Sequence, residues 1–390
     1  MTEPFRGVDF YDLDELLTEE QKAVRGTVRD WVSKRVIPII EKHNLDATFP
    51  SHLIGEMAEL GLLGAPLQGY DCAGMDSISY GLVLQELERG DSGIRSFASV
   101  QTSLCMWPIY TYGSEAQKKK YLPDMAHGRK VGCFGLTEPD FGSNPGGMIT
   151  RAKKKGSKWI LNGAKMWITN ATVADLAIVW AKDEAGTILG FVVDKDCKGY
   201  SSKETLHKFS LRASVTGELI FQDCEVSEDA LLPGVKGIKG PLSCLTQARY
   251  GIAWGAIGSA MACYDASVNY AKTRIQFGKP IGAFQLNQEK LAYMLTEITK
   301  GQLLSLRLGQ LKNAGKMKPE QVSLAKRNNV EIALNVARIA RDLHGANGIT
   351  SEYPVIRHMM NLESVKTYEG THDIHTLVLG QAATGIAAYE

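Results

Sequence analysis

The spacing of apolar residues changes twice along this chain, and this change limits the folds that it can adopt. Over about residues 18–129, apolar side chains recur every three or four positions, which is the period of amphipathic helices. Over about residues 130–234, short apolar and β-branched stretches alternate with turn signals such as Asn162-Gly163. From about Gly240 the helical period returns in longer segments. We therefore expect helices, then strands, then helices again.

The middle region leaves little room for crossover helices between its strands, so an antiparallel barrel or sandwich is favoured over a parallel sheet. We predict an α+β multi-domain fold with an α-helical N-terminal domain over residues 1–130. An antiparallel β-barrel domain is expected over residues 131–240, and a C-terminal four-helix bundle over residues 241–390. The length of 390 residues agrees with two or three packed domains.

The composition argues against nucleic-acid and membrane proteins. The formal net charge is +1, so the chain lacks the broad positive field that nucleic-acid binding uses. The most apolar run, residues 251–264, is shorter than the about 20 residues that cross a bilayer, and we interpret it as a buried helix. The acidic N-terminus resembles neither a signal peptide nor a transit peptide. We expect a bacterial cytoplasmic protein, or a mitochondrial matrix protein if the chain is a processed eukaryotic one.

Metal-binding and nucleotide-binding motifs are also missing. The seven cysteines are scattered and include no C-x-x-C pair, which fits a reducing compartment and argues against a disulfide framework. His372 and His375 form an H-x-x-H pair without a third ligand nearby, so we expect no metal. No G-x-G-x-x-G opens a βαβ unit and there is no Walker A sequence. The ordinary nucleotide cradles are therefore not expected.

Five short segments carry information about function that the periodicity does not. They are CFGLTEPDFGSN (133–144), KMWITN (165–170), RIQFGKPIGAFQLNQ (274–288), HGANGI (344–349) and TYEGTHDIH (367–375). In this order they resemble the acyl-CoA dehydrogenase family, and the similarity runs from about Leu17 to Ala388. Three further segments resemble its glutaryl-CoA dehydrogenase branch in particular: ELERGDSGIRS (86–96), KFSLRASVTGELI (208–220) and ARYGIAWG (248–255).

The resemblance implies the same three-part fold as the periodicity, and an FAD held without a Rossmann cradle. The residues that it assigns to the flavin side of the cofactor are Phe134, Leu136, Thr137, Ser143, Trp167, Ile168 and Thr169, and it also assigns Gly142 and Thr371 to the cofactor. Those that it assigns to the pyrophosphate and adenosine, partly from a neighbouring subunit of a homotetramer, are Arg274, Phe277, Gln285, Leu343 and Gly345. Phe141 and Asn144 depart from the x-G-S-D form that this segment often has.

For the chemistry, the resemblance implies that Glu369 removes the α-proton of an acyl-CoA thioester. Burial would raise its pKa above the roughly 4.3 of a free glutamate. Gly370 would let the thioester come close, and the backbone N–H of Glu369 would donate to the thioester oxygen. Substrate contacts are also implied for Ser143, Leu242, Leu245 and Arg249. An electron-transfer flavoprotein is the expected electron acceptor.

The implied substrate depends on a second group of residues. Arg95, with Ser96, would select an anionic acyl end such as the distal carboxylate of glutaryl-CoA, because a buried arginine needs a partner. Glu88 and Tyr368 match the family members that also decarboxylate, which gives crotonyl-CoA and CO2. We therefore expect Glu369, Arg95, Tyr368 and Glu88 to be the catalytic residues.

Other interpretations stay open at this point. The chain could be a short-chain acyl-CoA dehydrogenase or oxidase, or a glutaryl-CoA dehydrogenase that does not decarboxylate. It could also be a non-catalytic flavin- or CoA-binding assembly protein. Taken alone, Glu369 would be a solvated loop residue, Glu88 and Arg95 a helical ion pair, and Arg274 a surface ion-pair partner.

Overall fold

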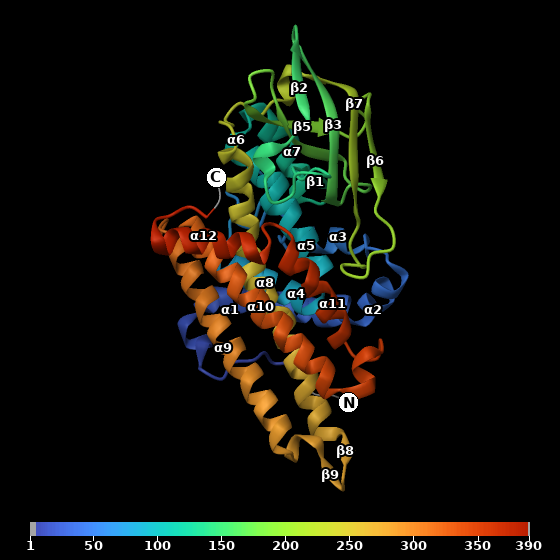
Figure 1. Cartoon of the computed structure of the whole chain (residues 1–390), viewed down its shortest axis with the longest axis vertical. Coiled ribbons are helices and arrows are strands. Elements are labelled where there is room, and N and C mark those ends of the chain that lie inside the picture. The colour runs from blue at the N-terminus through green and yellow to red at the C-terminus, as the bar shows by residue number, and fades with distance from the viewer. Residues whose placement is uncertain (1–4, 389–390) are drawn as a thin grey trace.

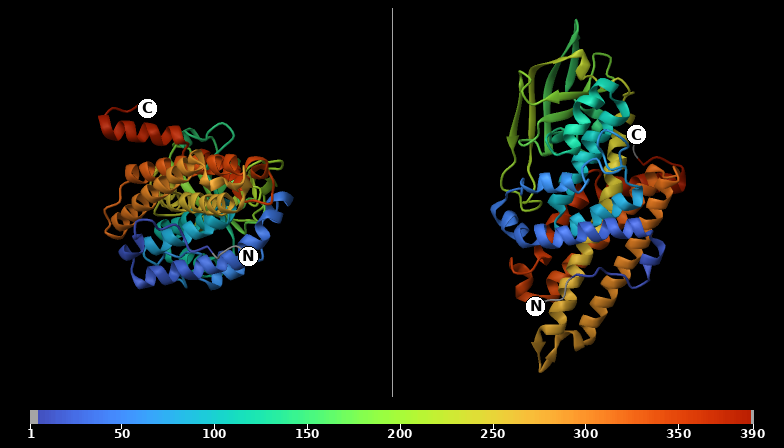
Figure 2. Two further views of the ribbon diagram at one scale, coloured as in Figure 1. Left: turned by 90° about the horizontal axis from the view of Figure 1, so that it is seen from below. Right: turned by 180° about the vertical axis from the view of Figure 1, so that it is seen from behind.

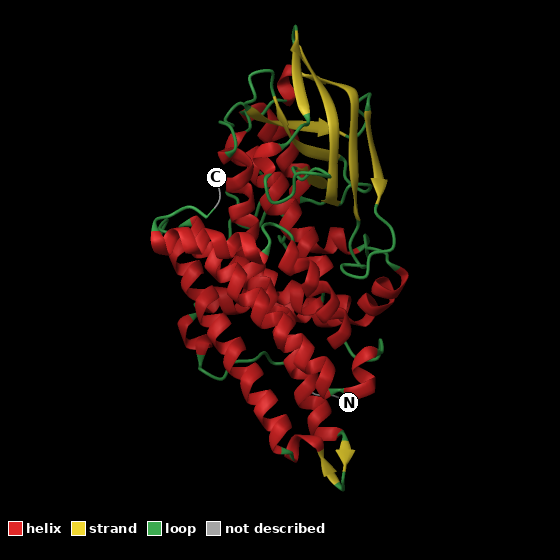
Figure 3. Cartoon of the chain, viewed as in Figure 1, coloured by secondary structure: helices red, strands yellow, loops and turns green. Residues whose placement is uncertain are grey.

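Two helical parts and one curled sheet make up the chain, in the order that the periodicity predicts (Figure 1). The computed structural model describes residues 5–388. The sheet lies at one end of an elongated molecule, and a small hairpin lies at the opposite end, with helices between them (Figure 3). The expected fold class is confirmed by this arrangement.

Side-chain caps set the ends of the N-terminal helices. The side chain of Thr18 accepts from the N–H of Gln21, whose side chain accepts in return from the N–H of Thr18, and this capping box starts α1. Asp76 starts α4 by accepting from the N–H of Ile78. The helices of this part are α1 (Glu19–Trp31), α2 (Ile37–Asp46), α3 (Leu53–Glu59), α4 (Ser77–Gly90), α5 (Ser92–Ser99), α6 (Trp107–Tyr112) and α7 (Glu115–Ala126).

Helix α4 is buried on every side, which is unusual for a helix that carries charges. It packs against α1 and against α8 (Lys239–Thr273), the long first helix of the C-terminal part. Gly258 of α8 lies directly against the carbonyl of Gln85, where any Cβ would collide. Because burying an unpaired charge is costly, the charged residues of α4 need partners inside the protein. Glu86, for example, binds Arg29 and Arg89.

The middle part is a curled sheet with the hydrogen-bonded order β1-β4-β2-β3-β7-β6, to which β5 adds beside β4. Most neighbouring strands are antiparallel, as expected, but β4 pairs in parallel with β1 and with the start of β2. The strands are β1 (Gly132–Gly135), β2 (Arg151–Lys155), β3 (Lys158–Thr169), β4 (Leu176–Lys182), β5 (Ile188–Asp194), β6 (Tyr200–Glu204) and β7 (Thr216–Ser227).

Asn162-Gly163 is not a turn, and this expectation from the sequence was wrong. Strand β3 continues through the pair, and β7 pairs with β3 on both sides of it. Gly163 has a φ of 147°, and a Cβ at this position would lie 2.5 Å from the Oγ1 atom of Thr150. The glycine therefore serves a bulge and the close approach of Thr150, which directly precedes β2, rather than a hairpin.

The C-terminal part is a bundle of long helices. Besides α8 it contains α9 (Gln285–Asn313), α10 (Pro319–Leu343), α11 (Val355–Thr367) and α12 (His372–Thr384). The apolar run 251–264 lies inside α8 and is almost wholly buried, as expected. Helix α12 packs on α10 and lies at the edge of the bundle (Figure 2). Within residues 5–388, none of the helices has the length and apolar character needed to span a bilayer.

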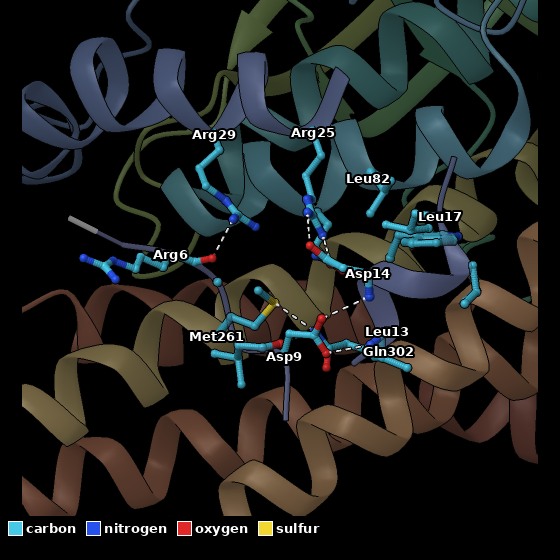
Figure 4. A pocket seen from close by; sticks show the side chains of 15 residues that line it. Arg6, Asp9, Leu13, Asp14, Leu17, Arg25, Arg29, Leu82, Met261 and Gln302 are labelled. Carbon is cyan, nitrogen blue, oxygen red and sulfur yellow. Dashed lines mark hydrogen bonds and ion pairs between the residues drawn. The ribbon is translucent and has the colours of Figure 1, made fainter. Parts of the chain in front are cut away.

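The segment before α1 links the two helical parts. It runs over α1, α4, α8 and α9 and encloses a cavity with them (Figure 4). Asp14 of this segment forms an ion pair with Arg25 of α1, with an N–O distance of 2.5 Å. The side chain of Gln302 in α9 donates to the carbonyl of Val8 at 2.7 Å. These contacts fasten the N-terminal helices to the bundle.

Candidate active site

Glu369 lies in the short connection between α11 and α12. Its φ is 53° and that of Gly370 is 87°, so two consecutive residues are left-handed, which costs a non-glycine residue roughly 1–2 kcal/mol. A Cβ on Gly370 would lie 2.9 Å from the Nε2 atom of His375 and 3.1 Å from the Nη2 atom of Arg249. Thr371 caps the first turn of α12. The glycine therefore allows both the backbone turn and the close packing.

The carboxyl of Glu369 is placed to hold a proton. Its Oε2 atom is buried and has no hydrogen-bond partner among residues 5–388. Burial raises the pKa of Glu369, and the positive charges of Arg95, Arg249 and Lys326 oppose part of that rise. A buried carboxyl with a raised pKa and an unpartnered oxygen is suited to act as a general base.

Arg95 is fully buried between Glu88 and Tyr368. Its Nε atom donates to Glu88 Oε2 at 2.5 Å, and its Nη2 atom donates to the Tyr368 hydroxyl at 2.5 Å. The Tyr368 hydroxyl also lies 3.3 Å from Ser96 Oγ. The Nη1 atom of Arg95 has no partner within the described part of the chain. These four residues therefore meet in one place, next to Glu369.

Asp91 holds Glu88 and Arg95 face to face. It ends α4 and caps α5, because its side chain accepts from a backbone N–H in the first turn of α5. Its other oxygen accepts from Arg357 at 2.5 Å and from Asn361 at 2.9 Å, and both residues belong to α11. The ion pair of Glu88 and Arg95 is thus formed between two helices and not within one.

The residues expected at the flavin side lie where β1 and β3 end. Phe134 and Leu136 are buried, and Thr137 after them is half-buried. Trp167 has a left-handed φ of 62° at a register shift between β3 and β7, and 58% of its side chain is exposed. The N–H of Met166 donates to the carbonyl of Thr137 at 2.9 Å, so the two segments lie side by side.

Four other members of this set lie at the end of β3 or in the loop after β1, and Thr371 lies apart from them at the start of α12. Ile168 is buried and Thr169 is half-buried at the end of β3. Gly142 and Ser143 are exposed in the loop that follows β1. The structure thus brings the β1 and β3 residues together and leaves the loop residues open to solvent.

A buried ion pair between Lys165 and Glu138 stabilises this edge of the sheet. The Nζ atom of Lys165 donates to Glu138 Oε1 at 2.8 Å and to the carbonyl of Leu136 at 3.1 Å. Glu138 also accepts from the N–H of Thr150 at 3.0 Å. Burial lowers the pKa of Lys165 to about 8, although Glu138 opposes this. The pair fixes the backbone at Leu136 and Thr137.

Leu242, Leu245 and Arg249 are spaced by three and four residues on α8, so they share one face of that helix. Leu242 is exposed and Leu245 is buried. The Nε atom of Arg249 donates to the carbonyl of Glu369 at 2.7 Å. Arg249 therefore contacts the backbone of the candidate base.

The residues expected at the pyrophosphate and adenosine form a separate group. Arg274 and Phe277 belong to the hairpin of β8 (Ile275–Gln276) and β9 (Lys279–Pro280), and Gln285 starts α9 soon after it. This hairpin lies at the end of the molecule opposite the sheet (Figure 1). Leu343 and Gly345 are near the same end of α8, since Asn347 beside them bonds to Tyr270. Within one chain, the residues expected at the pyrophosphate and adenosine therefore lie apart from those expected at the flavin.

Lys326 belongs to the site but could not be assigned a role from the motifs. It lies on α10 and donates to the carbonyls of Tyr368 at 3.0 Å and Gly370 at 2.8 Å. The sequence nevertheless indicates that Lys326 is buried. It stands four residues after Val322 and four before Val330, so the three share the buried face of the helix. A lysine on such a face is seldom buried without a partner, so its position predicts polar groups beside it. Asp91, Glu138 and Lys165 lie within the family-like segments 86–96, 133–144 and 165–170, but the spacing of these residues does not indicate their roles.

His372 and His375 lie in different surroundings. His372 lies 3.3 Å from a carboxylate oxygen of Glu331. His375 is fully buried, and burial, with Lys326 and Arg249 nearby, lowers its pKa to about 3. Within the described residues there is no group of three or more histidine, cysteine, aspartate or glutamate side chains that could hold a metal ion.

Comparison with protein families gives three matches that together cover most of the chain. The acyl-CoA dehydrogenase N-terminal domain matches residues 18–129, the middle domain residues 133–224 and the C-terminal domain residues 235–384. A curated relative, an acyl-CoA dehydrogenase of Bacillus subtilis, is 36% identical over 375 residues, which are 95% of this chain and 99% of that protein.

Two solved structures are more similar still. The glutaryl-CoA dehydrogenase of Mycobacterium smegmatis shares 52% identity with a TM-score of 0.97, over 99% of this chain and 100% of that one. A structure of a glutaryl-CoA dehydrogenase of the same organism in complex with FADH2 shares 51% identity with a TM-score of 0.97, over 98% and 99% of the two chains.

Proposed function

This chain belongs to the acyl-CoA dehydrogenase family, and on that premise we propose that it oxidises glutaryl-CoA and decarboxylates the product to crotonyl-CoA. The chain is an FAD-dependent acyl-CoA dehydrogenase. What the proposal adds is the identity of the acyl group, the loss of CO2 and the role of each residue.

One observation carries the choice of substrate. Arg95 is fully buried, two of its nitrogens bind Glu88 and Tyr368, and its Nη1 atom has no partner among residues 5–388. A buried guanidinium with an unpartnered nitrogen is costly, and a carboxylate would satisfy it with a strong, charge-assisted hydrogen bond. An acyl chain that ends in a carboxylate supplies that group, and a plain aliphatic chain does not. Glutaryl-CoA fits this requirement.

The residues at the flavin side suit a flat, partly polar ring. Trp167 exposes a large apolar surface, and the hydroxyls of Thr137 and Thr169 lie at the ends of the strands beside it. Backbone N–H groups and hydroxyls here would donate to the ring carbonyls and nitrogens of FAD. When bound, FAD accepts the hydride from the β-carbon of the substrate.

Glu369 performs both proton transfers in this scheme. It takes the α-proton while its own backbone N–H donates to the thioester oxygen. The bond between the γ-carbon and the distal carboxyl carbon of the oxidised product then breaks, CO2 leaves, and the electron pair stays on the carbon chain as a dienolate. Glu369 returns its proton to the γ-carbon, which gives crotonyl-CoA. Glu88, Arg95 and Tyr368 provide the polar surroundings of the leaving carboxylate.

The enzyme is proposed to act as a homotetramer. The β8–β9 hairpin, which holds Arg274 and Phe277, lies at the end of the molecule opposite the sheet (Figure 1), so a neighbouring subunit would supply these residues to each FAD. The electron acceptor is proposed to be an electron-transfer flavoprotein.

The test is anaerobic mixing of the FAD-loaded enzyme with glutaryl-CoA, followed by flavin absorbance and product analysis. We expect bleaching of the flavin, and crotonyl-CoA and CO2 in equal amounts. An oxidised flavin after mixing would reject glutaryl-CoA as the substrate, and accumulating glutaconyl-CoA would reject the decarboxylation. Faster bleaching with butyryl-CoA would favour a short-chain enzyme. Rapid reoxidation by air without an electron-transfer flavoprotein would favour an oxidase.

A further inference from the structure

Three successive backbone carbonyls around Glu369 are each bound by a cationic side chain. Lys326 donates to the carbonyl of Tyr368 at 3.0 Å and to that of Gly370 at 2.8 Å. Arg249 donates to the carbonyl between them, that of Glu369, at 2.7 Å. The two cations come from different helices, α10 and α8, so the connection between α11 and α12 is held from two sides.

This arrangement explains how Glu369 keeps a left-handed backbone. Its φ of 53° is unfavourable for a residue with a side chain, and such a conformation persists only where surrounding contacts enforce it. Lys326 fixes the peptide group before Glu369 and the one after Gly370, and Arg249 fixes the peptide group between Glu369 and Gly370. Because the backbone sets the direction of the Cβ, these bonds also set where the carboxyl points.

Lys326 is also one of the charges that act on the carboxyl. Its side chain is almost fully buried, and burial lowers its pKa to about 7. The charged and titratable groups that face it are Glu369, which raises its pKa, Arg249 and Arg95, which lower it, and His375 of α12. A positive charge near Glu369 favours the carboxylate over the neutral acid, so the pKa of Glu369 is lower when Lys326 is protonated.

We propose that Lys326 is a positioning residue for the base: it holds the backbone carbonyls of Tyr368 and Gly370, the residues before and after Glu369, and its charge favours the carboxylate form that takes the substrate proton. This inference rests on the proposed role of Glu369. It assigns Lys326 no contact with the substrate or with FAD.

Two substitutions separate the effect of the hydrogen bonds of Lys326 from the effect of its charge. Lys326→Met removes both the hydrogen bonds and the charge, and Lys326→Gln keeps a donor but no charge. Without the charge the pKa of Glu369 rises, so the acidic limb of the pH profile for flavin reduction should move up by about 1 pH unit in both variants. Misplacement of the carboxyl should slow flavin reduction by about 10- to 100-fold in Lys326→Met, and by less in Lys326→Gln.

Lys312 offers a matched control. It is another lysine whose pKa burial lowers to about 7, but it lies 4.1 Å from the ring centre of Tyr250 and belongs to α9. Lys312→Met should leave the acidic limb where it is. Binding of crotonyl-CoA, followed by the change in flavin absorbance, should be retained within a few-fold in the Lys326 variants, because Lys326 is not assigned to the binding surface.

The measurements use the FAD-loaded enzyme, with glutaryl-CoA and with butyryl-CoA. An unchanged acidic limb in both Lys326 variants would overturn the proposal, and so would loss of FAD or of the fold in both, since Lys326 would then be a folding residue. The Glu369→Gln variant is measured beside them. If that variant still bleaches, the proposed function of Glu369 fails, which is a different result from a failure at Lys326.

Discussion

Burial and positive charge act on Glu369 in opposite directions. Burial raises its pKa, and Arg95, Arg249 and Lys326 restrain the rise. The carboxyl must be ionised to take a proton, so flavin reduction should slow as the pH falls through this raised pKa. Glu369→Gln should keep the binding of crotonyl-CoA but slow flavin reduction by about 100- to 10,000-fold above that pKa, and it should lose the acidic limb, because general-base catalysis is lost. Stopped-flow absorbance over a pH series measures both effects, and bleaching at the wild-type rate would exclude Glu369 as the base.

Arg95 and Glu88 must be tested together, because either one alone leaves a buried charge without its partner, which costs about 3–5 kcal/mol of stability. The double variant Arg95→Met, Glu88→Gln removes both charges. Its preference for glutaryl-CoA over butyryl-CoA, measured as the ratio of kcat/KM values, should fall by about 10- to 100-fold, the value of a charged hydrogen bond. An unchanged ratio would show that Arg95 does not select the acyl end.

Among elements, α4 and α8 approach closely because glycines of α8 make room for the charged residues of α4. A Cβ at Gly255 would overlap Glu88 Oε2 and lie 3.1 Å from Arg95 Nε. Gly255→Ala should therefore displace the ion pair, lower the free energy of unfolding by about 1–3 kcal/mol and weaken glutaryl-CoA turnover. Gly26→Ala is the matched control, since Gly26 is exposed on α1 with no atom near its Cβ position. It should stabilise the protein by about 0.5–1 kcal/mol. Thermal unfolding of both variants checks the contrast, and equal shifts would contradict it.

The elements themselves were largely predictable, because burial on one face leaves a period in the sequence. The cap at Thr18 and the long helices after Gly240 follow from local signals. Asn162-Gly163 misled the prediction because a glycine that makes room for a neighbouring strand has the same local signature as a turn. The meeting of Glu88, Arg95 and Tyr368 depends on residues more than 270 positions apart, so no local pattern contains it. It could be expected only from the resemblance to a family.

At the scale of the whole molecule, three of the expected site residues have left-handed backbones although they carry large side chains. They are Trp167, Phe277 and Glu369. Strained residues of this kind are enriched at functional sites, and they persist only where the surrounding structure enforces them. Two of them expose an aromatic ring to solvent, at 58% for Trp167 and 93% for Phe277. Phe277 stands in the turn between β8 and β9, at the end of the molecule opposite the sheet (Figure 1), and we propose that FAD covers the ring of Trp167 and a neighbouring subunit that of Phe277.

This geometry predicts that assembly and cofactor retention fail together. Phe277→Ser removes the exposed ring from the β8–β9 turn; this ring meets that of the half-buried Phe284 edge to face, so the core should be little affected. If the hairpin reaches the FAD of a neighbouring subunit, this variant should form fewer tetramers and lose FAD on dilution, while its monomer folds normally. Tyr11→Ser, which removes another exposed ring from the segment before α1, should change neither property. Light scattering and the ratio of flavin to protein absorbance measure the two outcomes. A Phe277→Ser tetramer with full FAD would mean that the hairpin binds neither a subunit nor its cofactor.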